Sequence, residues 1–368
     1  MKYDVAVIGA GPAGSASVAK LAQAGAKVLW LERQAVPRHK ACGGAMPSAI
    51  TPLYESIGRD ISKQLDHRVS RFRSAYNYSP FAPSVEISEP ILMVRRAAFD
   101  AHAIEHAIRC GDVDFRPLCS VLNLERETSH VRLKLVQGES INAPFAIVAN
   151  GARSNLVKTV GLRASATTGL AIDAELEVDD SLLEKHFDVV SFNFCCIESG
   201  YGWVFPKSDG LSCGIGGWYN PRKLGATLRT FLHNTIPSES VHKLTRRGHP
   251  IPIYSGVTPL TCGRVCVVGD AASLVDPIMG EGIRYAVKSG ILAAESVLAA
   301  DTSNGQLDYE SRLDTHIRPL LNTLCHLAAP DYRDAPEWFY DQFLRQGLTH
   351  EIFYSALAAQ QFKRKRRT

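Results

Sequence analysis

The chain has 368 residues, of which 45% are hydrophobic and 21% are charged. This length indicates about two domains, and the composition is typical of a globular protein with a large core, which excludes wholesale disorder. Five of the 41 Lys and Arg residues lie together at 363–367, and the remaining 36 are set against 37 acidic residues. The body of the chain is therefore nearly neutral and gives no basis for nucleic-acid binding.

The basic run at 363–367 has two interpretations. It is either a solvated chain end or a segment attracted to an anionic membrane surface, where each basic residue contributes about 1 kcal/mol. The sequence has no run of about 18 apolar residues, so any membrane contact would be peripheral. The first strand begins at Asp4, so we expect no signal peptide and a cytoplasmic location, with the cytoplasmic face of the membrane as the alternative.

The nine cysteines are odd in number and include no C-x-x-C pair. This pattern argues against a disulfide framework, a zinc site and a four-cysteine iron–sulfur cluster. We expect reduced thiols and no bound metal.

The N-terminal residues have the order of a dinucleotide-binding unit. Residues 4–8 predict a buried parallel strand, residues 16–24 a helix and residues 27–31 a second strand that ends on Glu32. The carboxylate of Glu32 can accept hydrogen bonds from a ribose diol and disfavours a 2′-phosphate, so the ligand is expected to be FAD or NAD rather than NADP.

A full G-x-G-x-x-G joins the first strand to the helix. Gly9 permits a tight turn, Gly11 lets the backbone approach a pyrophosphate, and Gly14 allows close packing of helix on strand. The N-terminus of the helix would then face the phosphates.

A second element near the C-terminal end favours FAD over NAD. A buried strand from Val265 ends in Gly269-Asp270, and a helix over 285–298 follows Gly280, Gly282 and Ile283. Asp270 can hold a ribitol hydroxyl, and the glycine-flanked helix start can direct N–H groups at the flavin. The alternative is a last strand–helix unit with no role in binding.

Three further segments complete the predicted elements. Residues 91–94 predict a strand, and Arg96 opens a helix to residue 107, from which its guanidinium would reach a phosphate or ribose or else lie on the surface. Residues 145–149 predict a buried strand that ends at Asn150-Gly151. The stretch 168–253 alternates in polarity, as in 170–176 and 189–195, and predicts antiparallel strands.

Tyr201, Trp203 and Phe205 alternate along one strand, so their side chains share one face. They are either ordinary sheet packing or a wall for a long apolar ligand. Residues 309–328 and 336–362 predict amphipathic helices that pack on the body, close an apolar tunnel or lie on a bilayer.

Taken in order, these motifs resemble the geranylgeranyl reductase family within the p-hydroxybenzoate-hydroxylase-like flavoproteins. The Y-x-W-x-F-P run at Tyr201 is the most discriminating of the markers, which extend over nearly the whole chain. In chain order they are Gly9-x-Gly-Pro-Ala-Gly14 with Glu32, Lys40-Ala-Cys42-Gly43-Gly44, Arg96-Ala-Ala-Phe99-Asp100, Asn150-Gly151-Ala152, Tyr201–Pro206 with Gly214-Ile-Gly216, Gly269-Asp270, and Gly280-Glu-Gly282-Ile283. Relatives often have Asp where this chain has Asn150, so the role of that acid does not carry over.

The resemblance implies an α/β fold, with a Rossmann-type FAD-binding domain, an inserted antiparallel β-sheet substrate domain and a helical C-terminus. We place the FAD-binding domain at 1–66, 92–160 and 254–308, the substrate domain at 67–91 and 161–253, and the C-terminal helices with the basic tail at 309–368. The cofactor contacts that we expect are Gly9, Gly11, Ala13, Gly14, Glu32, Cys42, Gly43, Ala45, Arg96, Ser120, Asp270, Gly280, Gly282 and Ile283.

The segment around Cys42 would lie over the flavin ring. Gly43 and Gly44 let the backbone pass close to the cofactor, and Lys40 either anchors a phosphate or lies on the surface. Cys42 is either a small apolar filler or a catalytic thiol near the reacting alkene, where it would position substrate or help to deliver a proton.

The activity implied is reduction of isolated C=C bonds of a polyprenyl substrate by hydride transfer from N5 of the reduced flavin, with Tyr201, Trp203 and Phe205 binding the lipophilic chain. NAD(P)H or reduced ferredoxin would serve as a transient electron donor. The alternatives are a flavin monooxygenase acting on an aromatic or peptidyl substrate, a flavoprotein quinone reductase, and a non-enzymatic FAD-binding protein. The sequence carries no signal for an oligomeric state.

Overall fold

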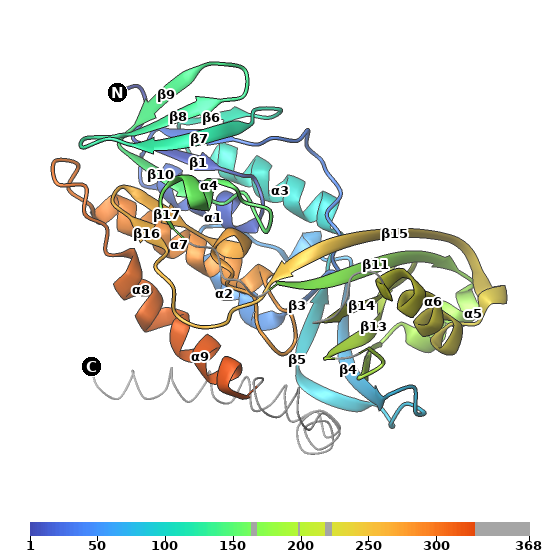
Figure 1. The fold of residues 1–368 in the computed structure, drawn as a ribbon. Coiled ribbons are helices and arrows are strands. Elements are labelled where there is room, and N and C mark those ends of the chain that lie inside the picture. The colour runs from blue at the N-terminus through green and yellow to red at the C-terminus, as the bar shows by residue number, and fades with distance from the viewer. Residues whose placement is uncertain (163–167, 198, 218–222, 328–368) are drawn as a thin grey trace.

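The computed structural model describes residues 1–162, 168–197, 199–217 and 223–327. The predicted helix at 336–362 and the basic run at 363–367 lie outside these ranges. The described chain forms a six-stranded sheet, an eight-stranded sheet and a three-stranded sheet (Figure 1). This mixed α/β architecture confirms the predicted fold class.

The six-stranded sheet has the order β16-β17-β10-β1-β2-β6 and is parallel except for the β16–β17 pair. Its strands are β1 (Val5–Ile8), β2 (Val28–Leu31), β6 (Val113–Arg116), β10 (Phe145–Val148), β16 (Thr261–Cys262) and β17 (Val265–Val267). β1, β2, β10 and β17 are buried throughout, because helices or a second sheet cover both faces. All four were predicted from their apolar runs.

Three helices cover one face of this sheet, and the three-stranded sheet lies on the other (Figure 1). The helices are α1 (Pro12–Gln23), α3 (Arg96–Arg109) and α7 (Ile283–Ala299). The three-stranded sheet consists of β7 (Val121–Arg126), β8 (Val131–Leu135) and β9 (Ser140–Ala143), and the short α4 (Leu156–Thr159) packs against β7. This small sheet was not predicted from the sequence.

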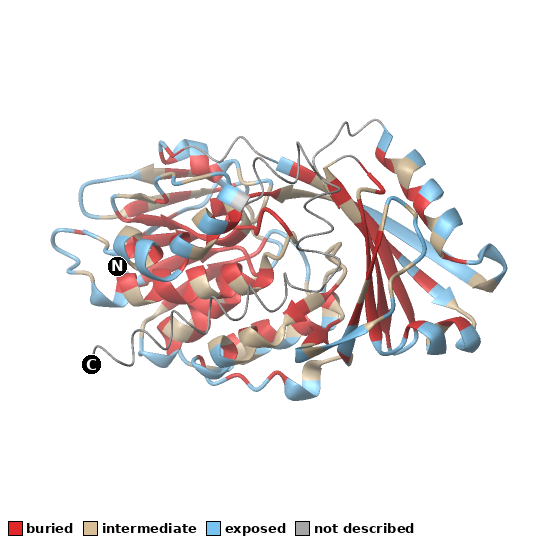
Figure 2. Ribbon diagram, turned by 90° about the horizontal axis from the view of Figure 1, so that it is seen from below, coloured by how far each residue is buried: buried red, intermediate tan, exposed pale blue. Residues whose placement is uncertain are grey.

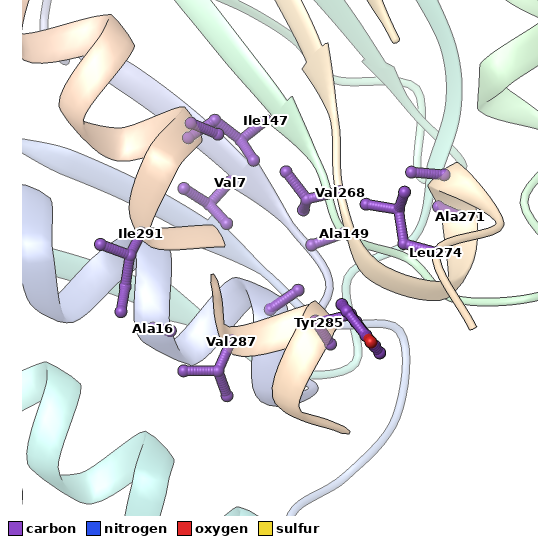
Figure 3. Close-up of a cluster of buried hydrophobic side chains, with 14 of the residues drawn as sticks. Val7, Ala16, Ile147, Ala149, Val268, Ala271, Leu274, Tyr285, Val287 and Ile291 are labelled. Atoms are coloured by element: carbon purple, nitrogen blue, oxygen red, sulfur yellow. The ribbon is translucent and has the colours of Figure 1, made fainter. Parts of the chain in front are cut away.

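Small residues let α1 and α7 approach each other closely. The hydroxyl of Ser17 donates to the Gly290 carbonyl oxygen at 2.9 Å, which ties the two helices together. Figure 3 shows apolar side chains from both helices and from the strand ends packed together, among them Val7, Ile147 and Ile291. This core fixes the strand ends from which the candidate site is built.

The eight-stranded sheet has the order β15-β11-β14-β13-β12-β4-β5-β3. Its strands are β3 (Ala45–Pro47), β4 (His67–Tyr76), β5 (Val85–Met93), β11 (Thr168–Val178), β12 (Val189–Phe194), β13 (Gly200–Lys207), β14 (Gly210–Gly217) and β15 (Val241–Pro252). Its pairs are antiparallel, as predicted, except that β12 pairs with β4 in parallel. The domain limits given above remain a prediction.

The two faces of this sheet belong to different cores. Val204 of β13 lies in a separate apolar core under α5 (Asp180–His186) and α6 (Leu224–Thr235), whereas Trp203 lies in the core shared with the parallel sheet. Figure 2 shows buried residues running along the strands of both sheets. The face of the eight-stranded sheet that carries Trp203 therefore shares one continuous core with the nucleotide-binding half.

The remaining helices are short. They are α2 (Thr51–Glu55), α8 (Tyr309–His316), α9 (Arg318–Leu327) and the 3-10 turns η1 (Ser48–Ile50), η2 (Ser62–Gln64), η4 (Ser238–Ser240) and η5 (Gly269–Ala272). The stretch 309–327 is helical as predicted, and it consists of two helices because the chain breaks at Ile317. Pro319 has no N–H to continue the helical hydrogen bonds, and its ring restricts Arg318. No helix within the described ranges is long and apolar enough to cross a membrane.

Candidate functional site

A cavity of about 620 Å³ lies between the six-stranded and eight-stranded sheets and is lined by residues of both. Its size and mixed lining suit a cofactor together with a small ligand. The predicted site residues that line it are Gly9, Gly11, Ala13, Glu32, Cys42, Gly43, Ala45, Ser120, Tyr201, Trp203, Phe205, Asp270, Gly280, Gly282 and Ile283. Two others, Gly14 and Arg96, lie behind the lining.

The glycines after β1 shape one end of the cavity. Gly9 has a φ of +106°, a backbone conformation that residues with a side chain rarely adopt. Gly14 has no room for a side chain, because a Cβ there would lie 1.9 Å from the Gly9 carbonyl oxygen. A Cβ on Gly11 would meet only the Arg38 guanidinium, at 3.7 Å, so the space above Gly11 is open. Because α1 begins at Pro12, its free N–H groups face this space, which suits a diphosphate.

Glu32 is buried at the end of β2 and is fixed by backbone donors. Its Oε2 accepts a hydrogen bond from Ala10 N at 2.7 Å, and its Oε1 accepts one from Gln34 N at 2.9 Å. The Arg38 guanidinium lies 3.9 Å from Oε2. The carboxylate is thus held rigidly at the cavity wall, where it can accept hydrogen bonds from a ribose diol.

Asp270 forms a second acidic position at the end of β17. Its Oδ2 lies 3.2 Å from Lys40 Nζ. Burial alone would raise the pKa of Asp270, but the charge of Lys40 and its hydrogen bond outweigh burial and lower it. The ion pair also fastens the segment before Cys42 to the end of β17, so Lys40 acts within the protein as well as facing the cavity.

The loop before α7 is tied to the aromatic strand. Asp276 Oδ1 accepts hydrogen bonds from Ile278 N at 2.6 Å and Met279 N at 3.0 Å, and burial raises the pKa of Asp276 to about 6. The hydroxyl of Tyr201 donates to the Met279 carbonyl oxygen. These bonds place the N-terminus of α7 and the side chain of Tyr201 at the same part of the cavity.

These groups fit FAD. The open space at the start of α1 accepts a diphosphate, Glu32 accepts from a ribose, and Asp270 and the start of α7 suit the ribitol and flavin. Asn150 Oδ1, also in a lining residue, is buried and has no hydrogen-bond partner among the described residues. A bound cofactor that donates a hydrogen bond would satisfy it.

The aromatic wall is larger than the sequence analysis predicted. Tyr201, Trp203 and Phe205 all line the cavity, and Phe72 and Phe192 join them from β4 and β12. The Phe192 ring centroid lies 5.5 Å from that of Tyr201 and 5.2 Å from that of Phe205. β12 is buried on both faces, so the alternation of its sequence, with Ser191 and Asn193 on one side and Phe192 on the other, does not show which side faces the cavity.

Cys42 lies at the cavity, with Arg96 behind it. We expected Arg96 to reach FAD, but Asp100, one turn later on α3, draws its guanidinium inward through hydrogen bonds of 3.0 and 2.8 Å. Burial alone would lower the pKa of Arg96, yet Asp100 and Cys42 together raise it. Gly44 N also donates to Cys42 Sγ, at 3.4 Å. Arg96 therefore supports Cys42 from inside the protein.

Gly43 passes against the aromatic wall as well as the cavity. A Cβ on Gly43 would lie 2.9 Å from the Phe205 ring and 3.1 Å from Trp203 Nε1. The missing side chain thus makes room for two rings, a reason that the sequence analysis did not contain.

Lys207 fixes the same segment and was missed by the sequence analysis. Its buried Nζ donates to Gly43 O at 2.7 Å and to Val94 O at 3.1 Å. Its position two residues after Phe205 on one strand is the signal that could have found it, because both side chains take the same face. Burial lowers the pKa of Lys207 to about 8.

The low pKa of Lys207 predicts a pH-dependent stability. The unfolded chain keeps the proton up to about pH 10.5, whereas the folded chain releases it near pH 8. Between these values the unfolded state binds more protons, so the free energy of unfolding should rise with pH by up to about 1.4 kcal/mol per pH unit. Lys207→Met should lose this slope in denaturant titrations from pH 7 to 11, and Lys185→Met, at an exposed site on α5, should keep it. An unchanged slope in Lys207→Met would contradict the assignment.

The sequence comparisons agree with this geometry. Residues 2–315 match the FAD binding domain family. The chain is 31% identical over 328 residues to the menaquinone reductase of Mycobacterium tuberculosis, with 81% of this chain and 77% of that protein covered. It is 28% identical over 398 residues to the chloroplastic geranylgeranyl diphosphate reductase of Arabidopsis thaliana, with 97% and 81% covered.

Among solved structures, a geranylgeranyl bacteriochlorophyll reductase-like protein from Thermoplasma acidophilum matches with a TM-score of 0.74 and 24% identity, over 89% of this chain and 90% of that one. At this identity the match shows a shared fold. The named relatives confirm the resemblance that the order of motifs indicated. The chain therefore belongs to the FAD binding domain family, as an FAD-dependent oxidoreductase whose relatives include geranylgeranyl reductases.

Proposed function

We propose that this oxidoreductase reduces isolated C=C bonds of a polyprenyl substrate. The observation that carries the proposal is the aromatic face of β13, where Tyr201, Trp203 and Phe205 line the same cavity as Glu32 and the glycines after β1. A flat apolar wall beside a flavin site suits a long chain of isoprene units. When bound and reduced, the flavin would supply a hydride.

The chain's own residues would orient the alkene and keep water away. Trp203 and Phe205 are buried, and Phe192 packs against Phe205, so the wall is rigid and dry. Such a surface holds a prenyl chain by apolar contact and fixes which carbon faces the cofactor. The phenol of Tyr201 is occupied by its bond to the Met279 carbonyl, which leaves the ring to contact substrate.

Cys42 would contribute by holding its thiol at a fixed position beside the substrate alkene. Its sulfur accepts a hydrogen bond from Gly44 N and contacts the buried Arg96, so it is fixed at the point where the 40–44 segment meets the aromatic wall. A thiol held there presents a compact apolar surface to an alkene without a carboxylate's desolvation cost.

The compounds named in two relatives share a prenyl chain but differ in head group. Geranylgeranyl diphosphate and menaquinone, named in two relatives, both carry a prenyl chain, and we assign the prenyl chain as the part that lies on the wall. NAD(P)H or reduced ferredoxin would reduce the flavin transiently. A lipophilic substrate would reach the site from a membrane by peripheral contact.

The name of the mycobacterial relative also favours a second candidate, reduction of a quinone ring. A quinone accepts electrons at its ring and needs no alkene. The two functions therefore differ in the atoms that gain hydrogen.

An anaerobic turnover experiment tests the proposal. The purified protein is reduced with dithionite and mixed with geranylgeranyl diphosphate, while the flavin spectrum and the product mass are followed. We expect flavin reoxidation with a gain of two hydrogens per cycle. Reoxidation by a short-chain quinone but not by the prenyl diphosphate would transfer the assignment to the quinone ring. Reoxidation only by air, with an oxygen atom added to an aromatic acceptor, would indicate a monooxygenase.

A further inference from the structure

Asp173 is an acid buried at the cavity wall that the proposed function has not used. It lies on β11, is 4% exposed and lines the cavity together with Ala171. Its strand neighbours Ile172 and Ala174 face the opposite way, toward the core under α6. The alternation of the strand therefore directs this carboxyl group toward the cavity.

A chain of donors joins Asp173 to the aromatic wall. Trp203 Nε1 donates to the Ser212 hydroxyl at 3.4 Å, and that hydroxyl donates to Asp173 Oδ1 at 2.7 Å. Gly43 lies against Trp203 Nε1, since a Cβ on Gly43 would be 3.1 Å from it. The carboxyl group is thus fixed near the place where the Cys42–Gly43 backbone crosses the wall.

The surroundings favour the protonated acid. Burial raises the pKa of Asp173, and the Glu175 charge adds to this, whereas the Ser212 hydrogen bond and the charges of Lys207 and His39 lower it; the balance raises it. On the neighbouring strand β14, the Cys213 thiol also interacts with Asp173, and its own pKa is raised by burial. Arg247 lies opposite Asp173 on β15 and also lines the cavity. A protonated carboxylic acid has one O–H to donate.

We propose that Asp173 is the proton donor of alkene reduction, an assignment that rests on the proposed function. The π bond breaks and two C–H bonds form: one carbon receives the hydride supplied by the reduced flavin, and the other receives the carboxyl proton of Asp173. Asp173 is left as a carboxylate that takes up a proton from solvent, and the two electrons that reduce the alkene would come from the bound, reduced flavin. An isolated alkene is a poor hydride acceptor, so an acid at the second carbon makes the step feasible.

A polar, half-exposed pair lies on the same face as Asp173. Glu175 lies two residues along β11 with its side chain half exposed, and its Oε1 is 3.3 Å from His39 Nε2. Both groups interact electrostatically with Asp173. We assign this rim of the cavity as the side from which the proton returns.

Three other candidate donors are placed differently. Cys42 sulfur accepts a hydrogen bond from Gly44 N, and Lys207 donates to the carbonyls of Gly43 and Val94. Asp276 also lines the cavity, and its Oδ1 accepts from the N–H groups of the loop before α7. Asp173 is the acid that the Ser212 hydroxyl joins to Trp203, the centre of the aromatic wall.

The test compares Asp173→Asn and Asp173→Glu with Glu177→Gln, a matched acid-to-amide change on an exposed residue of the same strand. In anaerobic single turnovers with geranylgeranyl diphosphate, Asp173→Asn should lower the rate about 100-fold. FAD content and reduction by dithionite should stay at the wild-type level. Asp173→Glu should recover part of the rate, and Glu177→Gln should match wild type.

Two readouts do not depend on the size of the rate. The infrared spectrum of the oxidised, substrate-free wild-type protein should contain the C=O band of a protonated carboxylic acid. Difference spectra of each variant against wild type should show that this band is lost in Asp173→Asn and kept in Glu177→Gln. The wild-type rate should fall as pH rises through the pKa of this acid. In Ser212→Ala, which removes a hydrogen bond that lowers the pKa of Asp173, that fall should move to higher pH.

The outcomes distinguish a failure of the proposed function from a failure of the role assigned to Asp173. A wild-type protein that reduces no prenyl substrate would overturn the proposed function and the role of Asp173 with it. A wild-type protein that is active while Asp173→Asn keeps its rate, or keeps the same fall with pH, would overturn the role of Asp173 alone. If Asp173→Asn fails to bind FAD, an unshifted pH profile in Ser212→Ala would overturn the assignment, and the shifted profile would support it.

Discussion

Glu32→Ala is expected to purify almost free of flavin. The carboxylate is buried, accepts hydrogen bonds from Ala10 N and Gln34 N, and is the acceptor that we assign to the FAD ribose. Its removal leaves the buried N–H of Ala10 without an acceptor, at a cost of about 1–3 kcal/mol, and removes the ribose contact as well. FAD affinity should fall by roughly 100-fold or more, measured from the flavin-to-protein absorbance ratio and from fluorescence titration of apoprotein.

Two variants control for general damage. Glu32→Gln keeps an oxygen acceptor without the charge and should retain FAD at intermediate affinity. Glu105→Ala removes an exposed acid from α3 and should bind FAD like wild type. A fully flavinated Glu32→Ala would show that the ribose is held by other groups.

Trp203→Ala is expected to affect long prenyl substrates far more than reduction of the flavin. The indole is buried between Phe205 and Tyr201 and lines the cavity. Loss of a central aromatic contact should lower kcat/KM for a 20-carbon prenyl substrate about 100-fold, or about 2.7 kcal/mol. The rate of flavin reduction by dithionite should be unchanged, because that step does not involve the wall.

Phe231→Ala provides the matched control for the loss of a buried ring. Phe231 packs on the opposite face of β13, where a Cβ on Gly202 would lie 2.3 Å from its ring. Both variants should lose about 3–5 kcal/mol of unfolding free energy. Below the melting transition, Phe231→Ala should keep kcat/KM within about threefold of wild type. Equal losses of kcat/KM in the two variants would mean that Trp203 serves only the stability of the sheet.

The nucleotide-binding half could be predicted from the sequence because its signals are local. The apolar run before Gly9, the glycine spacing and the acid at Glu32 are set by neighbours within about 30 residues, and the structure has β1, α1 and β2 at these places. The alternation of Tyr201, Trp203 and Phe205 also predicted their shared face. Even the break before α9 had a local signal, in Pro319.

The parts that sequence reasoning missed depend on distant contacts. Asp173 lies in an alternating strand, where a single acid is typical of a solvent-facing position, and it is buried in the cavity wall beside a serine of β14. Lys207 follows a proline at a strand end, a position typical of a turn, and its ammonium finds its partners in the carbonyls of Gly43 and Val94, more than 100 positions away. The parallel pairing of β4 with β12 joins residues more than 100 positions apart. No pattern within either segment encodes these partners.

The two-residue alternation of β13 has a consequence for how this scaffold could diversify. Odd-numbered positions from 201 to 205 face the ligand cavity, while Gly202 and Val204 face the core under α6. Selection acting on substrate range would therefore act on the cavity-facing set of this strand, while the other set serves the core under α6. Because Trp203 and Phe205 also pack against Gly43, changes at these positions in gene duplicates would be coupled to the 40–44 segment. A library of variants at positions 201, 203 and 205 would test directly how these positions set the substrate range.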